Sequence, residues 1–110
     1  MGASGASGAR RSILLLVSSM SAGGRSVRLG PRIVRILRSG GWEVAVRLTT
    51  PGDDPAALAG QVAADTIVAA LGGDGYLSAV ARGCHESSAI FAPMPGGRGN
   101  DLCRALGIGT

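Results

Sequence analysis

The chain has 110 residues, of which 45% are hydrophobic and 16% are charged, so it fits one modest globular domain and is too short for a complete two-domain enzyme. All eleven basic residues are arginine and the net charge is +4, which favours phosphate-bearing partners because a guanidinium can bind phosphate through two parallel hydrogen bonds. No segment approaches the roughly 20 apolar residues of a membrane span, and the apolar run after Arg10 and Arg11 is too short for an export signal. We therefore expect a cytoplasmic protein.

The first third of the chain predicts a tail, a strand and a helix. Residues 1–11, MGASGASGARR, cannot bury enough surface to order themselves and predict a flexible Gly/Ala/Ser tail. Residues 12–19 form a short aliphatic run, which is typical of a parallel strand buried on both faces. Residues 25–38 place apolar side chains on one helical face and arginines on the other, so they predict an amphipathic helix. Pro31 is expected to lie near the first turn of that helix, where proline is tolerated.

The rest of the chain continues the alternation of strands and helices. We predict strands at residues 42–48, 65–71 and 89–93, a turn at residues 72–75, and helices at residues 55–64, at residues 76–82 and from Asn100 onward. Such an alternation is typical of an α/β fold, here a Rossmann-like parallel sheet with alternating helices and right-handed crossovers. The loops after the strands then meet at one edge of the sheet, where ligands bind in folds of this class.

Three of those loops are rich in glycine: SAGGR after the first strand, GGDG after the third, and PGGRGND after the fourth. Only residues without a Cβ let an anion approach successive backbone N–H groups closely, and a helix N-terminus adds its positive dipole end. The two standard phosphate motifs do not fit, since the chain has no lysine for a Walker loop and Ser78 stands where G-x-G-x-x-G needs its last glycine. For GGDG alone, a plain tight turn remains an alternative interpretation.

The cysteines and the histidine predict no metal site. Cys84 and Cys103 are the only cysteines and have no second close pair, so we expect two small buried hydrophobic side chains. His85 lies in the polar stretch RGCHESS, without a partner at ligand spacing, and is expected to be an exposed loop residue.

Two of the glycine-rich loops together carry a resemblance to a known family. LGGDGYLSAVARG followed by APMPGGRGNDLCRALGI resembles the diacylglycerol kinase catalytic domain family, which includes bacterial lipid kinases, sphingosine kinases and ceramide kinases. In that family a strand leads to GGDGT and a helix, and a later strand leads to P-x-G-T-x-N-D and a further helix. The residues that match are Gly72, Gly73, Asp74, Gly75, Pro95, Gly97, Asn100 and Asp101.

The resemblance implies an ATP-dependent lipid kinase with Mg²⁺ as cofactor and a diacylglycerol or a sphingoid-like lipid as substrate. It implies that Asp74 is the catalytic residue, either as the base toward the lipid hydroxyl or through Mg²⁺. The ATP-binding residues that it implies are Gly23, Gly72, Gly73, Gly75, Gly97, Arg98, Asn100 and Asp101. Without the family, Asn100 and Asp101 would be interpreted as the N-cap and first-turn acid of the last helix.

The chain departs from the family pattern in four ways. The first loop, at residues 19–23, keeps only the final glycine of N-P-x-S-G, and the family threonines are replaced by Tyr76 and by Arg98, whose guanidinium could pair with a phosphate. Family members also continue into a β-rich second domain with lipid-binding residues. We therefore expect residues 12–110 to be the nucleotide-binding half, truncated before that domain, with weak ATP binding and no useful lipid phosphorylation by itself.

Three other functions are alternatives to a lipid kinase. A non-catalytic nucleotide-binding fragment would follow from the two lost hydroxyls and the absent domain. A relative of the NAD kinases would share GGDG, but GRGNDLCRALG fits the lipid kinases better. A nucleic-acid partner is not expected, since Trp42, Tyr76 and Phe91 are too few and too scattered to stack bases. The arginine face of the first helix could contact an anionic membrane, although a solvated helix face is the simpler interpretation.

Overall fold

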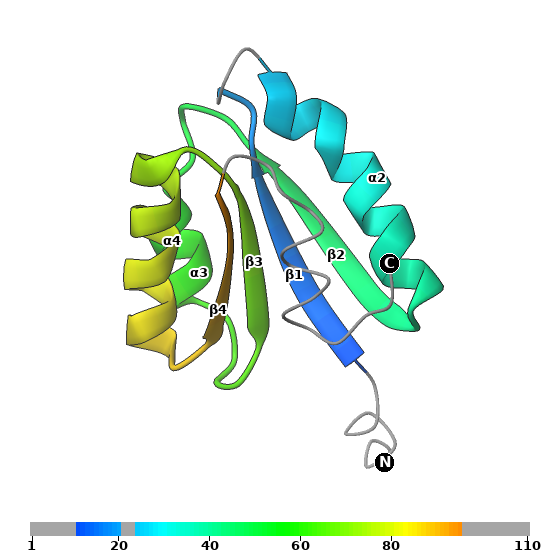
Figure 1. The fold of residues 1–110 in the computed structure, drawn as a ribbon. Helices are drawn as coiled ribbons and strands as arrows, with labels where there is room; N and C mark the ends of the chain where they lie inside the picture. The colour runs from blue at the N-terminus through cyan, green and yellow to red at the C-terminus, as the bar shows by residue number, and fades with distance from the viewer. Residues whose placement is uncertain (1–10, 21–23, 96–110) are drawn as a thin grey trace.

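A computed structural model describes residues 11–20 and 24–95 as a parallel four-stranded sheet with a helix after each of its first three strands (Figure 1). The strand order is β2-β1-β3-β4, and every neighbouring pair is parallel. This arrangement confirms the predicted Rossmann-like α/β class. In chain order the elements are β1 (Arg11–Ser18), α2 (Arg25–Ser39), β2 (Trp42–Thr49), α3 (Pro55–Gly60), β3 (Ile67–Gly72), α4 (Asp74–Ser87) and β4 (Ile90–Pro95).

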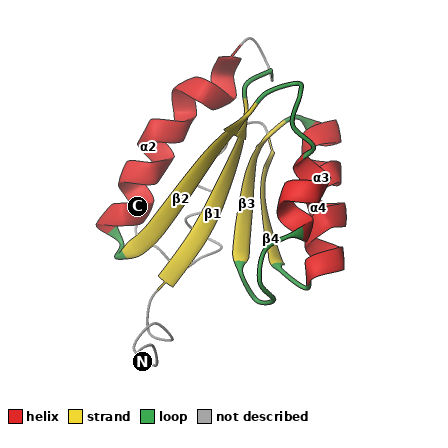
Figure 2. Ribbon diagram, turned by 180° about the vertical axis from the view of Figure 1, so that it is seen from behind, coloured by secondary structure: helices red, strands yellow, loops and turns green. Residues whose placement is uncertain are grey.

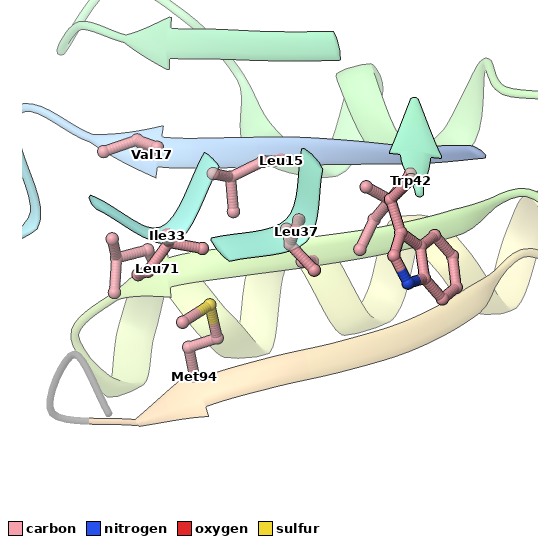
Figure 3. Packing of buried hydrophobic residues seen from close by; sticks show 9 residues of the cluster. Leu15, Val17, Ile33, Leu37, Trp42, Leu71 and Met94 are labelled. Carbon is pink, nitrogen blue, oxygen red and sulfur yellow. The ribbon is translucent and has the colours of Figure 1, made fainter. Parts of the chain in front are cut away.

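The helices cover opposite faces of the sheet, so the described residues form three layers (Figure 2). Alternate residues of each strand point to opposite faces, and β1 supplies Leu15 to one core and Leu16 to the other. Ile33 and Leu37 of α2 pack over the first core, where Leu15 and Met94 also lie (Figure 3). The second core lies under α3 and α4 and contains Leu16, Ala59, Val68, Ala70, Leu77, Val80 and Cys84.

The central strands confirm the prediction from their apolar runs. Leu15, Leu16 and Val68 are fully buried because helices cover both faces of β1 and β3. β1 begins at Arg11, the last residue of the predicted tail, and the rest of that tail lies outside the described residues.

Helix α2 departs from the prediction at Pro31, which lies inside the helix and beyond its first turn. A proline there removes the hydrogen bond to the carbonyl of Val27, at a typical cost of about 3 kcal/mol. The packing of Ile33 and Leu37 on the sheet offsets this cost. Val27, expected on the apolar face, is 39% exposed.

The two helices on the other face differ in length from the prediction. α3 is shorter and ends at Gly60, whereas α4 begins at Asp74 and continues to Ser87. The predicted turn at residues 72–75 is therefore wrong: Gly72 ends β3, Gly73 is the N-cap of α4, and Gly75 lies in the first helical turn. His85 is exposed, as expected, but it lies in α4 and not in a loop.

The longer α4 has a packing reason at Gly83. A Cβ on Gly83 would lie 2.2 Å from the carbonyl oxygen of Ala56 and 2.8 Å from the Cβ of Ala59, so α3 and α4 touch almost backbone to backbone. This contact, together with the burial of Cys84, keeps the polar stretch RGCHES helical.

We expect Gly83→Ala to lower the free energy of unfolding by about 1–3 kcal/mol, since the added methyl forces the two helices apart. The matched control is Gly75→Ala in the same helix, where a Cβ meets no described atom within 4 Å and alanine should raise stability by up to about 1 kcal/mol. Urea unfolding followed by circular dichroism measures both. Equal stability of the two variants would contradict the close helix contact.

Candidate functional site

The carboxyl ends of the four strands form one row along the edge of the sheet. Ser18 of β1 is in register with Thr49 of β2, and Gly72 of β3 is in register with Pro95 of β4. A Cβ on Gly72 would lie 3.1 Å from the Cβ of Ser18, which joins the two pairs. The first glycine of GGDG, which ends β3, therefore lies beside Pro95, the first residue of the second motif.

The N-terminus of α4 faces this edge without a side-chain cap. Gly73 is the N-cap, and its carbonyl accepts the first helical hydrogen bond from the amide of Leu77 at 2.9 Å. The amides of the first helical turn, at residues 74–76, have no carbonyl partner within the helix. By contrast, the side chain of Asp54 accepts hydrogen bonds from the amides of Ala56 and Ala57 at the start of α3.

Helix α2 also begins at this edge without a side-chain cap. Its N-cap is Gly24, with φ at 87° in the left-handed region, and its first turn contains no acidic residue. Arg28 reaches back toward this end, since its Nη1 is 3.6 Å from the position of a Cβ on Gly24. Two uncapped helix N-termini therefore follow the neighbouring strands β1 and β3, and both favour negative charge.

The fold does not require glycine at two positions of GGDG. Among the described residues, no atom lies within 4 Å of the position that a Cβ on Gly73 or on Gly75 would take. Gly73 has φ at −81° and ψ at 178°, an extended conformation that any residue adopts. Gly72 differs, because its Cβ would lie 2.6 Å from the ring of Tyr76. The first glycine thus serves packing, whereas the other two leave backbone amides open to a ligand.

Tyr76 joins the strand ends to the first turn of α4. Its Oη lies 2.8 Å from Oγ1 of Thr49, which in turn donates a hydrogen bond to the carbonyl of Val17 at 3.2 Å. Burial raises the pKa of Tyr76 above its ordinary value, so the phenol stays neutral at physiological pH. Its ring and the buried hydroxyl groups of Ser18 and Thr49 line a cavity of about 190 Å³.

The loop after β2 is held by Asp53. Its carboxylate accepts a hydrogen bond from the amide of Thr50 at 2.8 Å and one from Nη2 of Arg47 at 3.2 Å. These bonds, chiefly the one from the Thr50 amide, lower the pKa of Asp53. A lowered carboxyl pKa means that this stabilisation is complete at neutral pH and is lost as the pH falls through the folded-state pKa.

Asp74 is exposed as the first residue of α4, directly at the uncapped amides. Among the described residues, its carboxylate has no hydrogen-bond or ion-pair partner, so the fold does not account for it beyond a favourable interaction with the helix dipole. A carboxylate placed this way can meet a metal ion or a hydroxyl group.

The remaining predicted residues divide into two groups. Cys84 is buried, as expected, and burial raises the pKa of its thiol, so it is an unreactive core residue. Within residues 11–20 and 24–95, no three acidic, histidine or cysteine side chains cluster as metal ligands. The following residues lie outside the described part, together with the predicted last helix: Gly23, Gly97, Arg98, Asn100, Asp101 and Cys103.

The structure adds three residues that sequence reasoning did not assign to the site: Ser18, Thr49 and the phenol of Tyr76. Ser18 and Thr49 are buried polar residues at the ends of two neighbouring strands. A hydroxyl residue that ends an apolar strand is the signal that could have marked them, since all such ends share one edge in a parallel sheet.

Comparison with known proteins matches residues 12–110 to the diacylglycerol kinase catalytic domain. A search of curated proteins finds no match. In the described part of the chain, no helix is both long enough and apolar enough to cross a membrane. The matched domain is that of a kinase-type transferase. Because the match covers nearly the whole chain, the chain belongs to the diacylglycerol kinase catalytic domain family.

Proposed function

We propose that the chain is the ATP-binding part of a lipid kinase, and that the sheet edge at the N-terminus of α4 holds the phosphates of ATP. The observation that carries this proposal is the pair Gly73 and Gly75, two glycines that the fold does not need, at an uncapped helix N-terminus. Open amides at such a terminus bind phosphate oxygens through hydrogen bonds and the helix dipole.

Different residues along the edge would contact different parts of the nucleotide phosphates. The amides of the first turn of α4 would hold phosphate oxygens, and Arg28 would add positive charge from the neighbouring helix. Gly97, Arg98, Asn100 and Asp101 follow Pro95 in the chain, so their segment starts beside Gly72 and is proposed to complete the nucleotide site.

Asp74 would act on the transferred group. Magnesium in kinases is held by one or two carboxylates together with phosphates and waters, and a single exposed aspartate beside the phosphate amides fits that donor set. The bound metal would supply charge neutralisation on the phosphates. Asp74 would either hold it or orient the lipid hydroxyl and accept its proton.

The family match favours a lipid hydroxyl as the acceptor, of a diacylglycerol or a sphingoid-like lipid, over the NAD kinase alternative. The phosphates would lie on the sheet edge, so exclusion of water from the transferred group is expected to need further protein surface opposite this edge. We therefore expect the chain alone to bind Mg–ATP weakly.

Calorimetry of Mg–ATP with the purified chain tests the binding step. Labelled ATP and mixed micelles of diacylglycerol or sphingosine test the transfer, first with the chain alone and then with the chain fused to a β-rich lipid-binding domain of the family. We expect labelled lipid from the fusion and little from the chain alone. ATP binding with no labelled lipid in either case would contradict the kinase and leave a nucleotide-binding module.

A further inference from the structure

Strand β2 is an edge strand of unusual exposure. It pairs with β1 on one side, and no other described strand pairs with its outer edge. The four residues Ala45, Val46, Arg47 and Leu48 are all exposed, with Val46 and Leu48 each 48% exposed. Long exposed edges with apolar side chains are sites of pairing with another strand.

The outward direction of the backbone groups is fixed by two hydrogen bonds. The carbonyl of Thr49 accepts from the amide of Ser19 on the β1 side. Backbone groups alternate along a strand, so those of Val44, Val46 and Leu48 point away from β1. The carbonyl of Val44 accepts instead from Nη2 of Arg38 at 3.2 Å, in agreement with this direction. A carbonyl has two lone pairs and can accept a second bond.

The sequence of β2, WEVAVRL, is complementary to itself when read in the opposite direction. In an antiparallel pair centred on Ala45, Glu43 lies opposite Arg47 of the second copy and Val44 lies opposite Val46. This register also pairs outward backbone groups with outward backbone groups, because Val44 and Val46 both point to the partner. Charge, apolar pattern and hydrogen-bond direction therefore all fit one register.

The charged side chains retain capacity for this contact. Arg47 uses one nitrogen for Asp53, and a guanidinium has five N–H donors. Glu43 accepts from Oγ of Ser12 at 3.4 Å, and the two oxygens of a carboxylate together offer about four acceptor sites. Opposite charges directly across an antiparallel pair stabilise it, and like charges destabilise it.

A groove of about 790 Å³ lies along the same edge, between α2 and β2. Val27 and Val34 of α2 and Val46 and Leu48 of β2 supply its apolar lining, and Arg35 and Arg38 also line it. In an antiparallel pair of β2 strands the two-fold axis is perpendicular to the sheet, so α2 of each copy lies on the same face. The two grooves then adjoin, and each copy covers apolar surface of the other.

We propose that β2 pairs with β2 of a second copy in antiparallel register centred on Ala45, so that the protein is a two-fold symmetric homodimer with one continuous sheet. The interface joins the four described strands of each copy into one sheet and closes the exposed edge of β2 in each copy. The interface lies along the outer edge of β2, whereas the proposed ATP site lies at the carboxyl ends of the strands, so the proposal is independent of the proposed function.

Charge exchange tests the interface. Glu43→Arg and Arg47→Glu should each raise the dissociation constant of the dimer by about tenfold or more, because symmetry places the like-charge pair at two positions. The double variant should restore dimerisation, and Arg82→Glu on the exposed side of α4 is the control. Sedimentation velocity over a range of concentrations measures the constant, and circular dichroism checks folding. A monomer at every concentration, or a dimer indifferent to both single changes, would overturn the proposal.

A cysteine at the centre tests the register. Ala45→Cys should form a disulfide-linked dimer under mild oxidation, since opposing residues in a non-hydrogen-bonded antiparallel pair have Cα atoms about 4.5 Å apart, within disulfide reach. Ala57→Cys, exposed on α3, is the control and should remain uncrosslinked. Equal crosslinking of both variants, or none at Ala45→Cys, would reject this register.

Discussion

Gly73→Val is expected to abolish Mg–ATP binding while the fold remains intact. A Cβ at this position meets no atom of residues 11–20 and 24–95 within 4 Å, and the extended backbone of Gly73 suits valine. The branched side chain would instead fill the space through which a phosphate reaches the first-turn amides. Losing two hydrogen bonds to a charged group, at about 1.5–3 kcal/mol each, would raise the dissociation constant by about 10²–10⁴-fold.

The same result is expected for Gly75→Val, whose helical position tolerates valine at least as well as glycine. Isothermal titration calorimetry measures the affinity, and thermal unfolding measures stability. Ala63→Val is the matched control, since it adds the same kind of bulk at an exposed position before β3, at the opposite edge of the sheet. Unchanged ATP affinity in both glycine variants, with all three proteins folded, would show that GGDG serves only as a helix start.

The class of fold was predictable because the central strands are buried on both faces. Leu15 and Val68 lie in uninterrupted apolar runs, and such runs separated by helix-length segments indicate a parallel sheet. The place of GGDG followed from the same pattern, since the loops of a parallel sheet meet at one edge. The register of Gly72 with Pro95 agrees with that expectation for the start of the second motif.

The details that were not predictable depend on contacts between distant elements. Helix α4 continues through RGCHES because Gly83 contacts α3, and a local pattern of polar residues carries no sign of that contact. Pro31 stands inside α2 because packing on the sheet outweighs a local preference. Likewise, the hydroxyl pair of Thr49 and Tyr76 requires the β1–β2 register and the position of α4 together.

Tyr76 stands where the family pattern GGDGT has threonine, and its contacts show what the tyrosine does at this position. Its ring packs where a Cβ on Gly72 would lie, and its hydroxyl group is held by Thr49. The side chain therefore holds the first turn of α4 from the side that faces the strand ends. The amides at residues 74–76 lie at the sheet edge. The family hydroxyl is replaced by one that supports the turn from within the protein, so the phosphate contacts proposed here depend on the backbone.

Asp74→Asn is expected to leave Mg–ATP binding nearly intact and to remove lipid phosphorylation by the fusion with a lipid-binding domain. The amide keeps the size and position of the carboxylate at the start of α4, so the fold and the phosphate amides should be unaffected. It cannot accept the proton of a lipid hydroxyl and is a weaker ligand for magnesium, and loss of a positioned base costs about 10²–10⁴-fold in rate.

The two proposed roles of Asp74 give different results when the metal is varied. If Asp74 holds the metal, the variant should require more Mg²⁺ for the residual activity, whereas a pure base leaves that requirement unchanged. Glu86→Gln on the exposed end of α4 removes one charge from the same helix and is the control. Phosphorylation by Asp74→Asn near the unsubstituted rate would refute both roles, and the uncapped helix terminus would then bind nucleotide without catalysing transfer.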